Sequence, residues 1–165
     1  MITALLILHG LAGVALLGAL THQLVSLVRA GAMAADAGAV VRRDDSGKST
    51  FVRRYVSVGQ GGFTLAVVVL YVVTLIIGGV IYPTYRLDVR IPFEEMSLIW
   101  AVGLFEVKEH WGGIGLGVLP LYVFVWRPQQ ASSHQRDRFA ITILLSFIVW
   151  SDFIAGHVLN NIRGL

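Results

Sequence analysis

The sequence predicts an all-α integral membrane protein, a bundle of four transmembrane helices in a single domain that covers residues 1–165. Hydrophobic residues make up 56% of the chain, and charged residues only 14%. A soluble domain carries about 25% charged residues, so this chain lacks the residues for a water-facing surface. Four apolar runs each reach the roughly 20 residues that a helix needs to cross a bilayer.

Three of the four spans are clearly marked. The first covers residues 2–28, the second residues 62–82 and the fourth residues 139–159. Pro83 is expected to end the second helix, because the residue before a proline is biased away from helical geometry.

The third apolar region, Ile91 to Trp126, is about half again as long as one span requires, and it contains the charged run Glu106 to His110. In one division, a tilted helix begins near Glu94 and carries these charges deep into the membrane. In the other, residues 92–104 form an interfacial helix and the span covers residues 105–126. Burying two carboxylates and a lysine near the bilayer centre costs several kcal/mol, so we favour the second division.

Basic residues predict the orientation of the chain. The first and third connections, with their flanks, hold Arg29, Arg42, Arg43, Lys48, Arg53, Arg54, Arg127, Arg136 and Arg138. The other side holds only Arg86, Arg90, Arg163 and, in the favoured division, Lys108. The positive-inside rule therefore places both connections in the cytoplasm and both termini on the outer, periplasmic side. We expect a protein of the bacterial inner membrane.

Three further patterns concern helix surfaces. Trp111 and Trp126, about 22 Å apart along a helix, predict an aromatic belt at the two membrane faces. Gly113 and Gly117 have the small-xxx-small spacing that lets helices pack closely in lipid. Residues 51–58 are typical of a short amphipathic segment leading into the second span.

Side chains of ligand type gather near the outer surface on this topology. They are His9, His110 and His157, with the carboxylates Glu106, Glu109 and Asp152. Glu106 and His110 share a helix face, and with His9 and His157 they make a reasonable ligand set for a transition metal. Two of the three imidazoles would instead suit axial ligation of a haem b iron. The carboxylates are candidates for a proton relay, since intramembrane carboxylates are costly and by default functional.

Each of these residues also has a purely structural interpretation. A lone histidine can serve as an interhelical hydrogen-bond donor. Lys108 can pair with Glu106 and Glu109 at the membrane interface, and Asp152 can pair with His9 or Asn160. The absence of cysteine excludes disulfides, thiolate metal sites and iron–sulfur clusters. The sequence has no catalytic motif.

Two segments carry a resemblance. The run from Tyr82 to Arg90, YPTYRLDVR, followed by Leu104 to His110, LFEVKEH, resembles a pair of motifs in four-span bacterial membrane proteins. The resemblance implies the four-span topology and adds no mechanism.

The sequence thus predicts a small subunit or partner of a membrane electron-transfer complex, holding a haem b or metal ion near the outer leaflet. Two alternatives stay open. One is a structural or accessory subunit of a larger membrane complex without a cofactor. The other conducts protons or ions along Asp152, Glu106 and Lys108. The expected partners are the lipid bilayer and other membrane subunits or further copies of the chain, and no nucleic acid.

Overall fold

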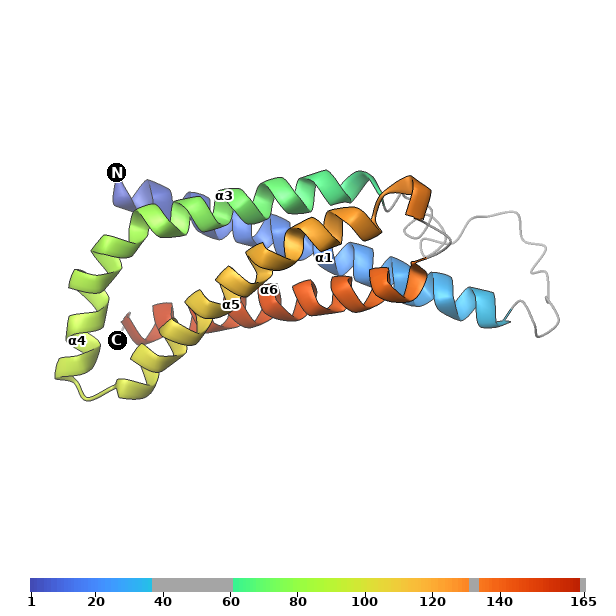
Figure 1. Ribbon diagram of the computed structural model, residues 1–165. Coiled ribbons are helices and arrows are strands. Elements are labelled where there is room, and N and C mark those ends of the chain that lie inside the picture. Colours follow the sequence, from blue (N-terminus) through green and yellow to red (C-terminus); the bar gives the residue numbers. More distant parts are fainter. Residues whose placement is uncertain (37–60, 131–133, 164–165) are drawn as a thin grey trace, which may run out of the picture.

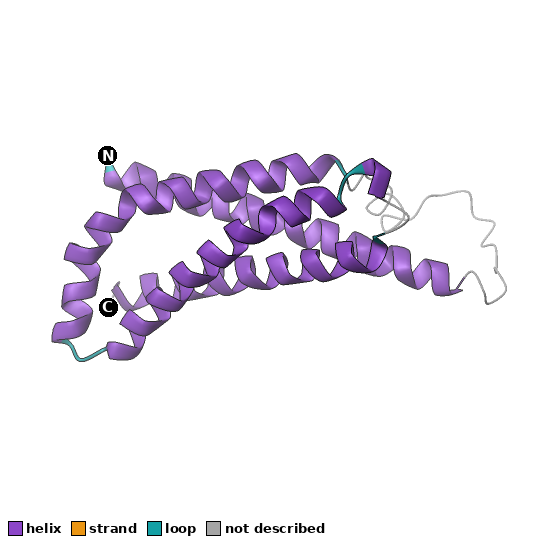
Figure 2. Ribbon diagram, viewed as in Figure 1, coloured by secondary structure: helices purple, strands orange, loops and turns teal. Residues whose placement is uncertain are grey.

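The computed structural model describes residues 1–36, 61–130 and 134–163, and within them the chain is helical with short loops (Figure 2). The long helices are α1 (Ile2–Asp36), α3 (Gly62–Tyr85), α5 (Ile99–Val125) and α6 (Gln135–Arg163). Short elements complete the chain: the π-helix η1 (Arg86–Arg90), α4 (Ile91–Glu95) and the 3₁₀ turn η2 (Pro128–Gln130). The predicted segment 51–58 and the basic residues between positions 42 and 54 lie outside the described residues.

Three helical stretches are long and apolar enough to cross a membrane: Ile2–Arg29, Gly62–Glu95 and Gln135–Ile162. α5, with 27 residues, is about 40 Å long and therefore also exceeds the roughly 30 Å of a hydrocarbon core. Large apolar side chains such as Leu65 and Ile76 of α3 are more than half exposed, as expected of helices that face lipid. The all-helical fold and the count of four long helices agree with the sequence prediction.

The helices form two pairs, α1 with α3 and α5 with α6, joined chiefly by contact between α1 and α6. Figure 1 shows that both pairs lie along one axis and diverge toward the end where the two termini lie. η1 and α4 cross this end from α3 to the start of α5, and we call it the terminal end. The ends of α1 and α5 and the starts of α3 and α6 lie at the opposite end, which we call the loop end. The described terminal residues, Met1 and Arg163, thus lie at the same end of the bundle.

Pro83 does not end the second long helix, contrary to the sequence prediction. α3 continues to Tyr85, and the chain passes directly into the π-helical turn η1. A proline inside a helix leaves one carbonyl without its N–H partner, and local π adjustments are a known way to accommodate this in a transmembrane helix. The chain turns after α3, so that η1 and α4 cross the terminal end (Figure 1).

The third apolar region breaks at a place that neither sequence division gave. α4 ends at Glu95 and α5 begins at Ile99, so the predicted interfacial helix over residues 92–104 is wrong in its bounds. The break is a Schellman cap, in which Ser97 has φ 59° and the Leu98 N–H donates to the Phe93 carbonyl at 2.8 Å. Glycine usually occupies this left-handed position, and its absence here hides the cap from sequence analysis.

The glycines that allow close packing are also not the predicted pair. Gly113 and Gly117 are exposed, and a Cβ added to either would meet nothing within 4 Å. Gly112 and Gly115 are buried instead, and a Cβ on Gly115 would overlap the hydroxyl of Tyr71 on α3. The face of α5 that packs inside the bundle is therefore the one with Gly112 and Gly115, and not the predicted one with Gly113 and Gly117.

Trp126 packs inside the bundle and does not form part of a lipid-facing belt. It is 5% exposed, and its indole N–H donates to Thr142 Oγ1 of α6 at 3.1 Å. The Arg138 guanidinium lies 4.7 Å from the centroid of its ring. Trp111 is half-buried and meets Phe147 edge to face at 5.4 Å. These tryptophans thus hold α5 against α6.

We expect Gly115→Ala to lower the free energy of unfolding by about 1–3 kcal/mol, the usual cost of forcing a methyl group into a packed contact. Gly117→Ala is the matched control and should have little effect, because open space surrounds that position. Adding Tyr71→Phe to Gly115→Ala should recover part of the loss, since the overlapping hydroxyl is gone. Denaturant unfolding in detergent checks this, and equal losses at positions 115 and 117 would contradict the rotation of α5.

Candidate functional site

The structure separates the three predicted histidine ligands. His9 is half-buried on the interior face of α1, and its Cε1 lies 3.2 Å from the position that a Cβ on Gly78 of α3 would occupy. His110 and His157 are exposed on α5 and α6. His110 turns back to its own helix, where its Nδ1 lies 2.6 Å from the Glu106 carbonyl oxygen.

The predicted metal ligands do not come together in the described part of the chain. In the described ranges, no group of three or more His, Asp or Glu side chains is arranged to hold a metal ion, and His9, Glu106, His110 and His157 all lie in those ranges. The rotation of α5 explains why His110 is not near the other ligands. Gly112 is buried and faces the interior. His110, two residues before it, lies about 200° around the helix and so faces outward.

Inside the bundle, the side chain of Lys108 on α5 points toward α6, and the side chain of Asp152 on α6 points toward α5. Lys108 Cε lies 3.6 Å from the position that a Cβ on Gly156 of α6 would occupy. Asp152 Oδ2 lies 3.7 Å from the corresponding position at Gly112 of α5. Each charged side chain thus packs against the facing helix beside a glycine. The two charges interact electrostatically without forming an ion pair within 4 Å.

The other two long helices contribute to the same region. Lys108 also interacts electrostatically with His9 of α1. Tyr71 of α3 lies near Asp152 and donates its buried hydroxyl to the Gly112 carbonyl at 2.9 Å. His9 Nδ1 and Asp152 Oδ1 are buried without a hydrogen-bond partner among the described residues. We call His9, Tyr71, Lys108 and Asp152 the interior polar cluster.

This position of Lys108 corrects one structural interpretation drawn from the sequence. Lys108 was expected to pair with Glu106 and Glu109 at the interface. Among the ion pairs within the described part of the chain, none includes it. One signal in the sequence does indicate its inward position: the apolar residues Ala101, Leu119 and Tyr122, which are seven, eleven and fourteen residues away, share its helix face.

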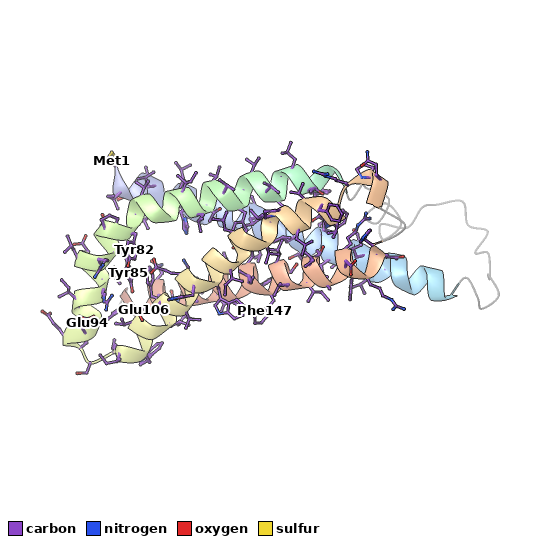
Figure 3. All side chains as sticks on the ribbon, in the orientation of Figure 1. Met1, Tyr82, Tyr85, Glu94, Glu106 and Phe147 are labelled. Atoms are coloured by element: carbon purple, nitrogen blue, oxygen red, sulfur yellow. The ribbon has the colours of Figure 1, made fainter. Side chains whose placement is uncertain are left out.

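Charged side chains continue from the cluster to the terminal end. Lys108 interacts electrostatically with the exposed Glu109. Arg90 of η1 reaches Glu94 at 2.7 Å and Glu106 of α5 at 3.6 Å. Figure 3 shows Glu94 and Glu106 at this end, together with Tyr82 and Tyr85.

Aromatic stacking joins the end of α3 to the start of α5. The rings of Tyr85 and Phe105 stack with centroids 3.5 Å apart, and Tyr82 continues the stack. Phe93 of α4 is buried against the start of α5 and the end of α6. This apolar contact fixes η1 and α4 above the interior polar cluster.

An apolar layer closes the bundle on the other side of the cluster. Its residues are at most 4% exposed: Leu16, Leu20, Val67, Leu119 and Leu145. Beyond it lies a second polar region, where Tyr122 donates a hydrogen bond to Gln23. The polar cluster is therefore separated from the loop end.

Comparison with protein families, with curated proteins and with solved structures finds no match.

Removing the charge of Lys108 or of Asp152 alone should destabilise the fold. We expect Lys108→Met or Asp152→Asn to lower the free energy of unfolding by about 1–3 kcal/mol, the usual cost of leaving a buried polar group without compensation. The double variant should cost less than the sum of the two, because no lone charge remains.

Reversible unfolding in detergent measures this coupling. Glu95→Gln is the matched control, since Glu95 is exposed at the end of α4. Additive losses in the double variant would show that the two charges do not interact.

Proposed function

We propose that the chain is a subunit of a larger membrane complex and supplies it with a proton-exchanging site inside the bundle. The observation that carries this proposal is the placement of Lys108 and Asp152 on facing helices, over Gly156 and Gly112. Ionisable side chains inside a membrane bundle are expensive and by default functional.

The chemistry of the cluster suits reversible protonation. Asp152 can accept a proton on Oδ1, which has no hydrogen-bond partner in the described part of the chain. Lys108 beside it supplies the compensating positive charge, and His9 adds an imidazole next to the Thr74 backbone. A proton added to this site, or removed from it, changes the net charge of the site. In a low-dielectric environment that change costs several kcal/mol unless a compensating charge moves. A proton bound here is therefore coupled to a change elsewhere in the complex.

The proposed access is from the terminal end. Glu109 and Glu106 are exposed there and relay protons toward Lys108 and Asp152. The apolar layer at Leu16, Val67 and Leu119 blocks the path to the loop end. On the orientation predicted from the basic residues, the site opens to the periplasmic side of a bacterial inner membrane. A one-sided site fits a subunit better than a channel.

The electron-transfer function expected from the sequence stays a prediction. The exposure of His110 and His157 means that a haem b or metal ion bound by either would take its remaining ligands from another chain. A visible spectrum of the purified protein, with metal analysis, tests for such a cofactor.

The proton-exchange proposal is tested by infrared difference spectroscopy during pH titration in liposomes. We expect the wild-type protein to show a protonated-carboxyl band that appears reversibly as the pH falls and is missing from Asp152→Asn. Glu95→Gln should retain the band. If Asp152→Asn leaves the titrating band unchanged, Asp152 does not exchange protons and the proposal is wrong.

A further inference from the structure

A groove lies between α1 and α6 at the loop end, far from the interior polar cluster. It is lined by Leu27 and Val28 of α1 and by Gln135, Arg136 and Phe139 of α6. Its volume is about 440 Å³, within the range of small-molecule sites in proteins. Figure 1 shows the start of α6 at the end of the bundle opposite both termini.

The groove combines apolar walls with a positive charge at one end. Leu27, Val28 and Phe139 supply the walls, and Arg136 is exposed and outside the ion pairs of the described residues. Arg29 and Arg127 add positive charge near the same end, and Asp137 is an acidic residue beside Arg136. Arg138 is already engaged, because its Nε donates to the Val125 carbonyl at 3.1 Å. Among the described residues that line the groove, Arg136 is the cation that an occupant would meet.

We infer that this groove binds an anionic phospholipid. The phosphate headgroup pairs with Arg136, and the first part of an acyl chain lies along Val28 and Phe139. The match is one of charge and polarity: a lipid is the molecule that presents a phosphate and a hydrocarbon chain together at this depth. Basic sites between transmembrane helices near a membrane surface bind such headgroups by the same chemistry. A soluble phosphate would leave the apolar walls uncovered.

Native mass spectrometry of the full chain in detergent tests this inference, with phosphatidylglycerol and phosphatidylcholine of identical acyl chains added in turn. The wild-type protein should retain phosphatidylglycerol in preference to phosphatidylcholine. Arg136→Gln should weaken phosphatidylglycerol retention about fivefold, since a basic residue near the surface contributes about 1 kcal/mol. Phe139→Ala should weaken the retention of both lipids.

The matched control is Arg127→Gln, which removes a basic residue at the same end that does not line the groove. It should leave the preference for phosphatidylglycerol unchanged. Equal retention of the two lipids by the wild-type protein would overturn the inference. So would equal losses in Arg136→Gln and Arg127→Gln, because general surface charge would then explain the binding.

Discussion

The packing of α5 against α6 centres on two side chains of opposite charge type, each of which lies against the other's helix. Lys108 Cε is 3.6 Å from the position that a Cβ on Gly156 would occupy, and Asp152 Oδ2 is 3.7 Å from the corresponding position at Gly112. Lys108 and Gly112 therefore mark the face of α5 that meets α6, and this face defines the rotation of α5. Once α5 has this rotation, Gly115 faces Tyr71, and Trp126 faces Thr142. The same rotation turns His110 and Glu109 outward.

With α5 in this rotation, the interior of the bundle consists of successive layers along its axis. At the level of Lys108, the long helices contribute polar side chains, whereas the next layer inward is closed by leucine and valine. The heptad spacing explains why the layers stay aligned: His9 is seven residues from Leu16 on α1, and Asp152 is seven from Leu145 on α6. A site that is polar on one side and sealed on the other follows from this arrangement.

Much of the fold could be predicted from the sequence, because apolar runs of sufficient length leave few alternatives in a membrane. The helical class, the four long helices and the common side of the termini all follow from those runs. The cap at Ser97 could not be predicted, because its left-handed residue is not glycine. Pro83 misled the prediction because a π-helical turn continues the chain after it.

The candidate site was predicted less well, and again for a physical reason. Depth along a helix can be read from a sequence, and on that ground Asp152 is a candidate from the sequence alone; the structure has its Oδ1 buried in the interior polar cluster. Which way a helix faces is much harder to read when its apolar residues surround it, as they do in α5. His110 and His157 were therefore expected to converge, but the structure has them exposed. Lys108 was expected at the interface, yet it points inward.

The central claim, a charged site open to one side of the membrane, is tested most directly by thiol accessibility. The chain has no cysteine, so Asp152→Cys in liposomes of known orientation reports on one position alone. A charged, membrane-impermeant thiol reagent should modify it from the terminal side and not from the loop side. Arg127→Cys should react from the loop side only. Modification of Asp152→Cys from the loop side, or from neither side, would contradict the account.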